Sequence, residues 1–311
     1  MPRYASFSSY PIDWHALRID SLGHFSLRRV ERSPSARTLR MIDSHRIQLV
    51  LADVDGTLVL PDKTITERAR AAVRKLDEAN IVFAVTSGRP ARGMAMLLEP
   101  LALRTPIAGF NGGMLVSPDL TSLEMKAIPP KLVGPIVHHL LERRLDAWIY
   151  QWNEWLLRDP NAPHAEREQR TVQFAPIVTN DLESHVGGVV KIVGVSDDRA
   201  VMEAGESELR ERFGDRLAVA RSQAHYLDIT HPDANKGEVL RHLSREYGVP
   251  HEAIATVGDM PNDVLMFALS GLSIAMGQAS DEVKRTARRV TKSNTQDGFA
   301  EAIERYVLNE H

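Results

Sequence analysis

An alternation of apolar runs with amphipathic stretches, interrupted once and then resumed, constrains the fold of this chain more than any other feature. The run IQLVLADV at 47–54 is apolar almost throughout, as a parallel strand covered on both faces should be. The stretch 66–80 keeps its apolar side chains on one stripe and begins with Thr66, a suitable N-cap, so it predicts an amphipathic helix. Further apolar runs follow at 81–88 and 105–113. Strand, helix and strand in this order predict right-handed crossovers and a parallel sheet.

The interruption covers residues 130–226, where helical stretches and short strand-like runs follow one another without the strand–helix order. The alternation then returns and continues to the C-terminus. We therefore predict an α/β fold with a Rossmann-like, doubly wound parallel core formed by 47–129 and 227–311, and an inserted α+β domain at 130–226. In the insert, Trp148 and Trp152 are expected on one face of a short hairpin and Trp155 on the other, as packing residues.

Residues 1–46 differ from the rest of the chain. The first 40 residues carry seven arginines against three acidic residues and have no sustained hydrophobic period, so this extension is expected to be poorly ordered. An Arg- and Ser-rich composition is also typical of transit segments. The simpler expectation is that translation starts at Met41, just ahead of the first strand.

Composition excludes several classes of function. A formal net charge of −3 over 311 residues gives no basic footprint for nucleic acid. The absence of cysteine rules out disulfides and thiolate chemistry, and no apolar run reaches the length of about 18 residues that a membrane span needs. We expect a cytoplasmic protein that acts on a small molecule and binds neither nucleic acid nor membrane; the sequence leaves a monomer and a dimer open.

Polar side chains follow several of the predicted strands at the point where each strand ends. Asp53, Ser87, Asn111 and Asp259 occupy such positions, and ligands of open α/β sheets bind beyond the carboxyl ends of the strands. Asp53 and Asp55 would point to the same side of an extended chain, where two uncompensated carboxylates are costly.

A hard divalent cation bound by oxygen would offset that repulsion. The segment GDMPND fits the same picture, because Asp259 ends a strand and Asp263 lies one helical turn further on. A set of oxygen ligands without cysteine favours Mg²⁺ over Zn²⁺.

The same residues can carry phosphoryl transfer. A carboxylate can attack phosphorus and form an aspartyl-phosphate, while a neighbouring carboxylate protonates the leaving oxygen and later deprotonates water. Such a reaction needs the charge of the phosphoryl oxygens to be neutralised. Lys236 is a candidate cation, and the Ser87 hydroxyl and the backbone amides of SGR and DGT are candidate hydrogen-bond donors.

Four motifs in this order resemble those of the haloacid dehalogenase-like phosphatase superfamily: DVDGT at 53–57, TSGR at 86–89, NKG at 235–237 and GDMPND at 258–263. The insert between the second and third motifs, the NGG at 111–113 and the TSGR form are similar to the Cof-type subfamily of sugar and cofactor phosphatases. The resemblance covers roughly 47–311 and omits the N-terminal extension.

The resemblance implies a role for each matching residue. Asp53 would be the nucleophile and a Mg²⁺ ligand, and Asp55 the general acid/base whose backbone carbonyl also binds the metal. Ser87 and Lys236 would hold the phosphoryl group, Asp259 would ligate the metal, and Asp263 would support it from the outer shell. Further substrate-binding residues would be Gly88, Arg89, Asn111 and Gly112.

The expected function is thus a Mg²⁺-dependent phosphomonoesterase whose insert selects the substrate. Two alternatives stay open at this point: a phosphotransferase or mutase that uses the same nucleophile, and a non-catalytic sensor of a phosphorylated ligand. The histidines give no further signal. His138, His139 and His164 lack the spacing of a metal site, and His225 and His231 are expected at the surface.

Overall fold

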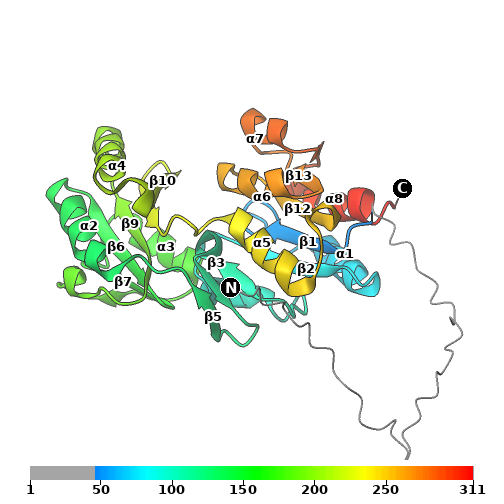
Figure 1. The fold of residues 1–311 in the computed structure, drawn as a ribbon, viewed down its shortest axis with the longest axis horizontal. Coiled ribbons are helices and arrows are strands. Elements are labelled where there is room, and N and C mark those ends of the chain that lie inside the picture. The colour runs from blue at the N-terminus through cyan, green and yellow to red at the C-terminus, as the bar shows by residue number, and fades with distance from the viewer. Residues whose placement is uncertain (1–45, 311) are drawn as a thin grey trace, which may run out of the picture. The chain divides into compact units, whose positions relative to one another are not determined.

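The computed structural model describes residues 46–310, so the predicted N-terminal extension lies outside the described residues except for its last position. The strands form two sheets (Figure 1). The larger sheet has the order β14-β13-β12-β1-β2-β3-β4-β5. Its strands are β1 (Leu49–Asp53), β2 (Val82–Thr86), β3 (Ile107–Gly109), β4 (Met114–Val116), β5 (Ser122–Met125), β12 (Ile254–Gly258), β13 (Leu272–Ala275) and β14 (Arg289–Val290).

The larger sheet is parallel from β14 to β3, as predicted, and β4 and β5 continue it in antiparallel register. Its helices are α1 (Glu67–Glu78), α5 (Lys236–Tyr247), α6 (Val264–Leu269), α7 (Asp281–Thr286) and α8 (Gly298–Ala302). Thr66 caps α1, because its side chain accepts a hydrogen bond from the Ala69 amide at 3.1 Å.

Helices cover both faces of this sheet. Val50 and Ala52 of β1 share a hydrophobic cluster with residues of α1 and α8, whereas Leu49 and Leu51 share another with residues of α5 and α6. Side chains alternate along a strand, so β1 is buried on both sides, which explains its uninterrupted apolar sequence.

The smaller sheet has the order β10-β11-β9-β6-β7-β8 and is antiparallel except for the β7–β8 pair. Its strands are β6 (Asp146–Gln151), β7 (Glu154–Leu157), β8 (Ile177–Val178), β9 (Val189–Val195), β10 (Ala218–Gln223) and β11 (Tyr226–Thr230). The helices of this part are α2 (Pro130–Glu142), α3 (Ala165–Val172) and α4 (Arg199–Phe213). Strand β11 runs to Thr230, so this sheet extends four residues past 226, where we placed the end of the insert.

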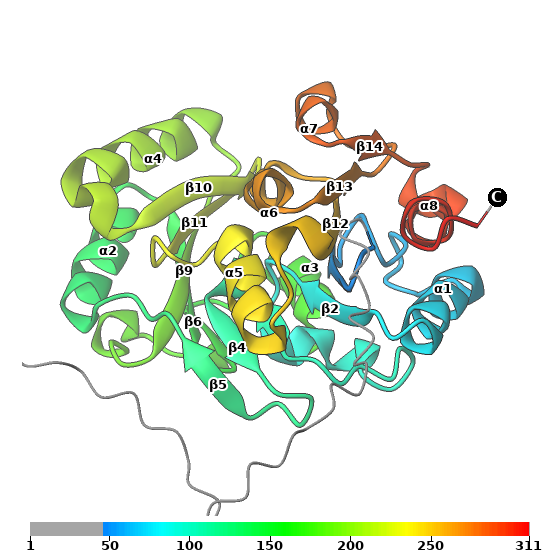
Figure 2. The ribbon, with the colours of Figure 1, turned by 45° about the vertical axis from the view of Figure 1, so that its right-hand side comes forward.

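The two faces of the smaller sheet have different environments. Ile192 of β9 and both Leu227 and Ile229 of β11 pack in one cluster with α2 and α4, which lie beside these strands in Figure 2. Val193 and Tyr226 belong instead to the cluster that includes residues of the larger sheet. The ring of Phe110, just after β3, lies 5.3 Å from that of Tyr150 on β6.

The tryptophans of the β6–β7 hairpin correct the prediction in two respects: Trp155 lies on the same face as Trp148 and not on the opposite one, and Trp152 lies in the connecting turn. Trp148 and Trp155 are buried against each other with ring centroids 5.2 Å apart, whereas Trp152 is 59% exposed. Trp152 has a φ of 59° in the connecting turn, so the alternation that predicts it beside Trp148 breaks at that point.

Among the helices of residues 46–310, none combines the length and the apolar character that crossing a bilayer requires.

Candidate active site

The predicted site residues meet at the carboxyl edge of the larger sheet. Strand β1 lies between β2 and β12, so Asp53 at its end stands next to Ser87, which follows β2, and to Asp259, which follows β12. The edge is thus built by three neighbouring parallel strands from distant parts of the sequence. This confirms the physical premise that polar residues after parallel strands converge.

A buried lysine organises the aspartates. Lys236 is the first residue of α5, which begins where Asn235 accepts a hydrogen bond from the Glu238 amide. The Lys236 ammonium, 1% exposed, donates to Asp53 Oδ1 at 2.6 Å and to Asp263 Oδ1 at 2.5 Å. Burial alone would lower the pKa of Lys236, but the charges of Asp263 and Asp53 outweigh it and raise that pKa.

Asp263 has no free carboxylate oxygen. While Oδ1 accepts from Lys236, Oδ2 accepts hydrogen bonds from the amides of Asp259 and Met260 at 2.8 and 2.9 Å. Asp263 therefore fixes the turn after β12, and with it the backbone of Asp259. This agrees with a supporting role in the outer shell.

The two aspartates at the ends of β1 and β12 are held in an environment that disfavours their charge. Burial raises the pKa of Asp53 well above its ordinary value; the Lys236 ammonium opposes this rise, and the Asp263 and Asp259 carboxylates add to it. Burial, with the Asp263 carboxylate second, raises the pKa of Asp259 to about 6.

These aspartates fit a divalent metal. Carboxylate oxygens of Asp53, Asp259 and Asp263 lie within 4.8 Å of one another, and of these three residues only Asp263 has both oxygens occupied by hydrogen bonds. Asp259 Oδ1 is buried and has no hydrogen-bond partner among the described residues. A set of oxygen donors with one unsatisfied carboxylate oxygen suits a hard cation such as Mg²⁺, which would favour the ionised forms of both strand-end aspartates.

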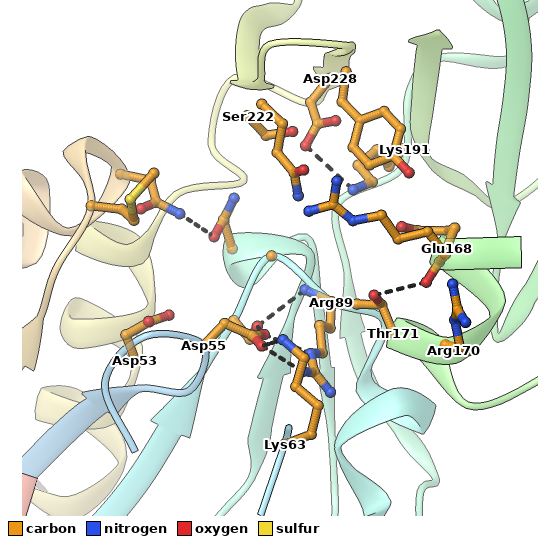
Figure 3. A pocket seen from close by; sticks show the side chains of 18 of the residues that line it. Asp53, Asp55, Lys63, Arg89, Glu168, Arg170, Thr171, Lys191, Ser222 and Asp228 are labelled. Carbon is orange, nitrogen blue, oxygen red and sulfur yellow. Dashed lines mark hydrogen bonds and ion pairs between the residues drawn. The ribbon is translucent and has the colours of Figure 1, made fainter. Parts of the chain in front are cut away.

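Asp55 lies apart from this cluster and binds different cations. Its carboxylate accepts two hydrogen bonds from the buried Arg89 guanidinium, with Nε at 2.5 Å, and one from Lys63 Nζ at 2.7 Å (Figure 3). Ser87 Oγ lies 3.4 Å from the same carboxylate. Burial alone would raise the pKa of Asp55, but the bonds and charges of Arg89 and then Lys63 outweigh it and lower that pKa.

A glycine between the two groups allows a close approach. Gly56 has a φ of +78°, and a Cβ at this position would lie 2.3 Å from Asp259 Oδ2. Gln278 Nε2 binds both sides of this contact, donating to Gly56 O at 2.5 Å and to Asp259 Oδ2 at 3.3 Å. Glycine is therefore required at position 56, because a side chain there would collide with Asp259 of the GDMPND motif.

A pocket of about 670 Å³ opens beside Asp53 and Asp55. It is lined from the larger sheet by Asp53, Asp55, Lys63, Ser87, Gly88, Arg89 and Asn111, and from the other side by residues of α3, β9, β10 and β11. Asn111 accepts a hydrogen bond from Asn262 Nδ2 at 3.0 Å. Gly112 is buried, and a Cβ there would lie 2.5 Å from Val239 Cγ2, so its position serves packing against α5.

Several residues of the site were not found from the sequence. Lys63 and Gln278 lie in loops with no strand-end signal, and the residues opposite the aspartates, Lys191, Tyr226 and Asp228, alternate with apolar core positions. The fold also assembles a histidine cluster that sequence spacing did not reveal: His164 Nε2 lies 2.7 Å from Asp197 Oδ1, and its ring stacks 3.8 Å from that of His225.

A doubly wound parallel sheet with an inserted α+β part and an aspartate cluster at its carboxyl edge is the architecture of one class of hydrolase with a Rossmann-like core. The family model for haloacid dehalogenase-like hydrolases matches residues 50–303, and the chain belongs to that family. The family, the fold class and the enzymatic nature that the four motifs predicted are thereby confirmed.

Curated relatives of this chain include phosphatases. The chain is 28% identical over 270 residues to the 5-amino-6-(5-phospho-D-ribitylamino)uracil phosphatase YitU of Bacillus subtilis, covering 83% of this chain and 97% of the relative. It is 25% identical over 231 residues to the HMP-PP phosphatase of Cronobacter sakazakii, covering 74% and 84%. A crystal structure of a haloacid dehalogenase-like hydrolase from Bacteroides thetaiotaomicron superposes with a TM-score of 0.77 at 28% identity, covering 84% of this chain and 99% of that one.

Proposed function

We propose that this protein is a Mg²⁺-dependent phosphomonoesterase that hydrolyses a small phosphorylated metabolite through an aspartyl-phosphate on Asp53. The observation that carries the proposal is the contrast between two aspartates two residues apart. Asp53 is buried, and its carboxylate accepts a hydrogen bond from Lys236. Asp55 borders the pocket, and its carboxylate accepts hydrogen bonds from Arg89 and Lys63. Two carboxylates in different environments suit two different roles in one reaction.

In the first step, the Asp53 oxygen that does not accept from Lys236 attacks phosphorus. The bond from phosphorus to the leaving oxygen breaks, and Asp55 supplies the proton that this oxygen takes up. Lys236 and the Ser87 hydroxyl offset the charge of the phosphoryl oxygens.

In the second step, Asp55 removes a proton from water, whose oxygen attacks the phosphorus of the aspartyl-phosphate. The bond from phosphorus to Asp53 breaks, inorganic phosphate leaves, and Asp55 is protonated again for the next cycle. Over both steps one water is consumed and one alcohol and one phosphate are released.

Asp53 and Asp259 would hold the Mg²⁺ with the backbone carbonyl of Asp55, and Asp263 would support them. When bound, the ion supplies positive charge that neutralises the transferring phosphoryl group and keeps these aspartates ionised. Among the described residues, the oxygen donors gathered at the edge of β1 and β12 are what supports this assignment.

The substrate is expected to be a metabolite of moderate size. A pocket of about 670 Å³ has room for a phosphorylated sugar or cofactor precursor as well as the phosphoryl group. The relatives' substrates, a phosphoribitylamino-uracil and HMP-PP, are of this kind. A cytoplasmic location stays a prediction from the cysteine-free sequence.

The test is release of phosphate from a panel of sugar phosphates, pyridoxal phosphate, flavin mononucleotide and p-nitrophenyl phosphate, with Mg²⁺ and with a chelator. Asp53→Asn is the control, because it removes the nucleophile and keeps an acceptor for Lys236. We expect Mg²⁺-dependent release that falls by about 10⁴-fold or more in the variant. Wild-type rates in Asp53→Asn would contradict the proposal, and transfer of phosphate to an added acceptor sugar would indicate a phosphotransferase instead.

A further inference from the structure

A second group of metal-ligating side chains lies in the insert. His164 stands just before α3, Asp197 lies between β9 and α4, and His225 lies in the turn that joins β10 to β11. None of the three lines the pocket beside Asp53 and Asp55. The fold therefore brings three loops together at a place that the proposed phosphatase chemistry does not use.

The donor atoms of these residues are close together. One ring nitrogen of each histidine and one carboxylate oxygen of Asp197 lie within 4.8 Å of one another. His164 Nε2 lies 2.7 Å from Asp197 Oδ1, and the two imidazole rings stack with planes inclined by 8°. Donor atoms held at about 2.0–2.2 Å from one tetrahedral ion lie about 3.3 Å from one another. Rotation of one ring out of the stack would therefore let all three residues bind a single ion.

His225 has a ring nitrogen that the protein itself does not use. His225 Nε2 is buried and has no hydrogen-bond partner within residues 46–310. Its ring lies between that of His164, 3.8 Å away, and that of Tyr226, 4.3 Å away and edge-on. Buried polar atoms are nearly always hydrogen-bonded in proteins, so an unpartnered imidazole nitrogen in this cluster indicates a missing ligand.

The backbone at His164 is also unusual. Its φ of 70° is a left-handed conformation that residues with a Cβ adopt infrequently. His164 occupies the N-cap position of α3, yet its side chain makes no capping hydrogen bond and contacts Asp197 instead. Such a conformation persists only where the surroundings hold it, and a bond from the ring to an ion would be one such restraint.

The donor set defines the kind of ion. Imidazole nitrogen suits transition metals such as Zn²⁺ and Co²⁺, whereas Mg²⁺ prefers oxygen ligands. Two imidazoles and one carboxylate are three ligands, which leave the fourth tetrahedral position to water. This set thus differs in chemistry from the all-oxygen cluster at the edge of β1 and β12.

We propose that His164, Asp197 and His225 form a second metal site, which binds a transition-metal ion such as Zn²⁺ and ties the start of α3 to the β10–β11 turn. Both α3 and β11 contribute residues to the wall of the pocket, so the ion would hold two parts of that wall together. The inference goes beyond the proposed function and does not depend on it.

One nearby charge opposes the binding of a cation. Arg167, in the first turn of α3, lines the same cavity of about 530 Å³ as His164. The Asp197 carboxylate offsets part of this charge. Because Arg167 is exposed, its guanidinium can turn toward solvent when an ion enters.

The experiment is a titration of the full chain, prepared without a histidine tag, with Co²⁺ in an excess of Mg²⁺. Co²⁺ replaces Zn²⁺ as a coloured probe, and its spectrum reports geometry. A tetrahedral ion with nitrogen ligands absorbs visible light strongly, whereas an octahedral ion on oxygen ligands absorbs weakly. We expect one equivalent of Co²⁺ to give the strong tetrahedral spectrum and one equivalent of Zn²⁺ to abolish it.

The variants His164→Gln, His225→Gln and Asp197→Asn each remove one ligand and should weaken Co²⁺ binding by at least about 10-fold. Asp197→Asn tests the site even if a histidine variant fails to fold, because the Asp197 side chain is 69% exposed. The matched control is His138→Gln. His138 also belongs to the insert and lies 3.1 and 3.5 Å from two glutamate oxygens, but it has no second histidine beside it among these contacts.

Three outcomes would overturn the inference: no tetrahedral spectrum in the wild type, an unchanged affinity in the three ligand variants, or an equal loss in His138→Gln. A tetrahedral spectrum that disappears in Asp259→Asn instead would place the ion at the strand-end aspartates and would also overturn it. All of these are measurements of binding, so none of them decides whether the protein releases phosphate.

Discussion

The buried guanidinium of Arg89 donates two hydrogen bonds to the carboxylate of Asp55, and these bonds draw that carboxylate toward TSGR and away from the aspartates that bind Lys236. Asp55 is thus held as an anion by its own set of cations. In this arrangement it is ready to accept a proton, and it must be protonated before it can serve a leaving group.

Lys63 provides a test through the pH profile. Burial alone would raise the pKa of Asp55, but the hydrogen bonds and charges of Arg89 and Lys63 lower it overall. Removing the Lys63 charge should therefore raise that pKa. Because the protonated form serves the leaving oxygen, the alkaline limb of kcat/KM should move to higher pH in Lys63→Met. The exposed Lys131→Met is the control. A profile that coincides with wild type would contradict the link between Lys63 and the acid/base group.

Removing the acid/base group itself should affect the rate and leave the fold intact. Asp55→Asn is expected to lower kcat by about 10²–10⁴-fold, the usual contribution of a general acid or base. Steady-state kinetics with p-nitrophenyl phosphate should show a smaller loss, because its leaving group needs little protonation. Equal losses for aryl and alkyl phosphates would place the main effect on the second step, in which Asp55 removes a proton from water, and an unchanged rate for both would contradict the acid/base role.

Lys236→Met should destabilise the protein in a pH-dependent way. The variant leaves Asp53 and Asp263 buried without a cation, which typically costs about 3–5 kcal/mol. Burial already raises the pKa of Asp53, so the folded state gains stability from protonation as the pH falls. In urea unfolding, the loss in free energy of unfolding relative to wild type should therefore be larger at pH 7.5 than at pH 5. A loss of the same size at both pH values would contradict this explanation.

Metal affinity should weaken in acid. Without metal the pKa of Asp259 is about 6, raised by burial and by Asp263, and a divalent ion binds only the ionised form. The Mg²⁺ concentration for half-maximal phosphate release should thus be nearly constant above pH 7 and rise as the pH falls below about 6. Asp259→Asn should raise this concentration at every pH and remove the part of its pH dependence that Asp259 contributes, while the raised pKa of Asp53 leaves a remainder. A pH-independent value in the wild type would speak against Asp259 as a ligand.

Gly56→Ala separates backbone strain from the effect on the site. Gly56 and Gly248 have φ values of +78° and +64°, so alanine at either position costs about 1–2 kcal/mol of strain. Only at Gly56 does the new Cβ meet Asp259 Oδ2; at Gly248 no atom of the described chain lies within 4 Å. We expect similar losses in thermal stability but a rise in the Mg²⁺ requirement for Gly56→Ala alone. The same Mg²⁺ requirement in both variants would contradict a close contact between residue 56 and Asp259.

The parts of the site that lie on strand ends were predictable, because a strand position and a residue type together fix where a side chain points. Asp53 and Asp259 are of this kind. Contacts between loops were not predictable in this way: Lys63 reaches Asp55 across a turn, and Gln278 reaches Gly56 from 222 residues away. Trp152 was misplaced because a single left-handed turn residue ends the alternation on which its prediction depended.

The alternation along β11 separates two kinds of constraint on neighbouring residues. Leu227 and Ile229 pack against α2 and α4, while Tyr226 and Asp228, each one position away, line the pocket beside the aspartates. Substitutions on the second face can change the lining of the pocket while the first face preserves the folded insert. The shape and charge of the pocket can therefore vary one residue at a time without any change in the core that holds the insert together.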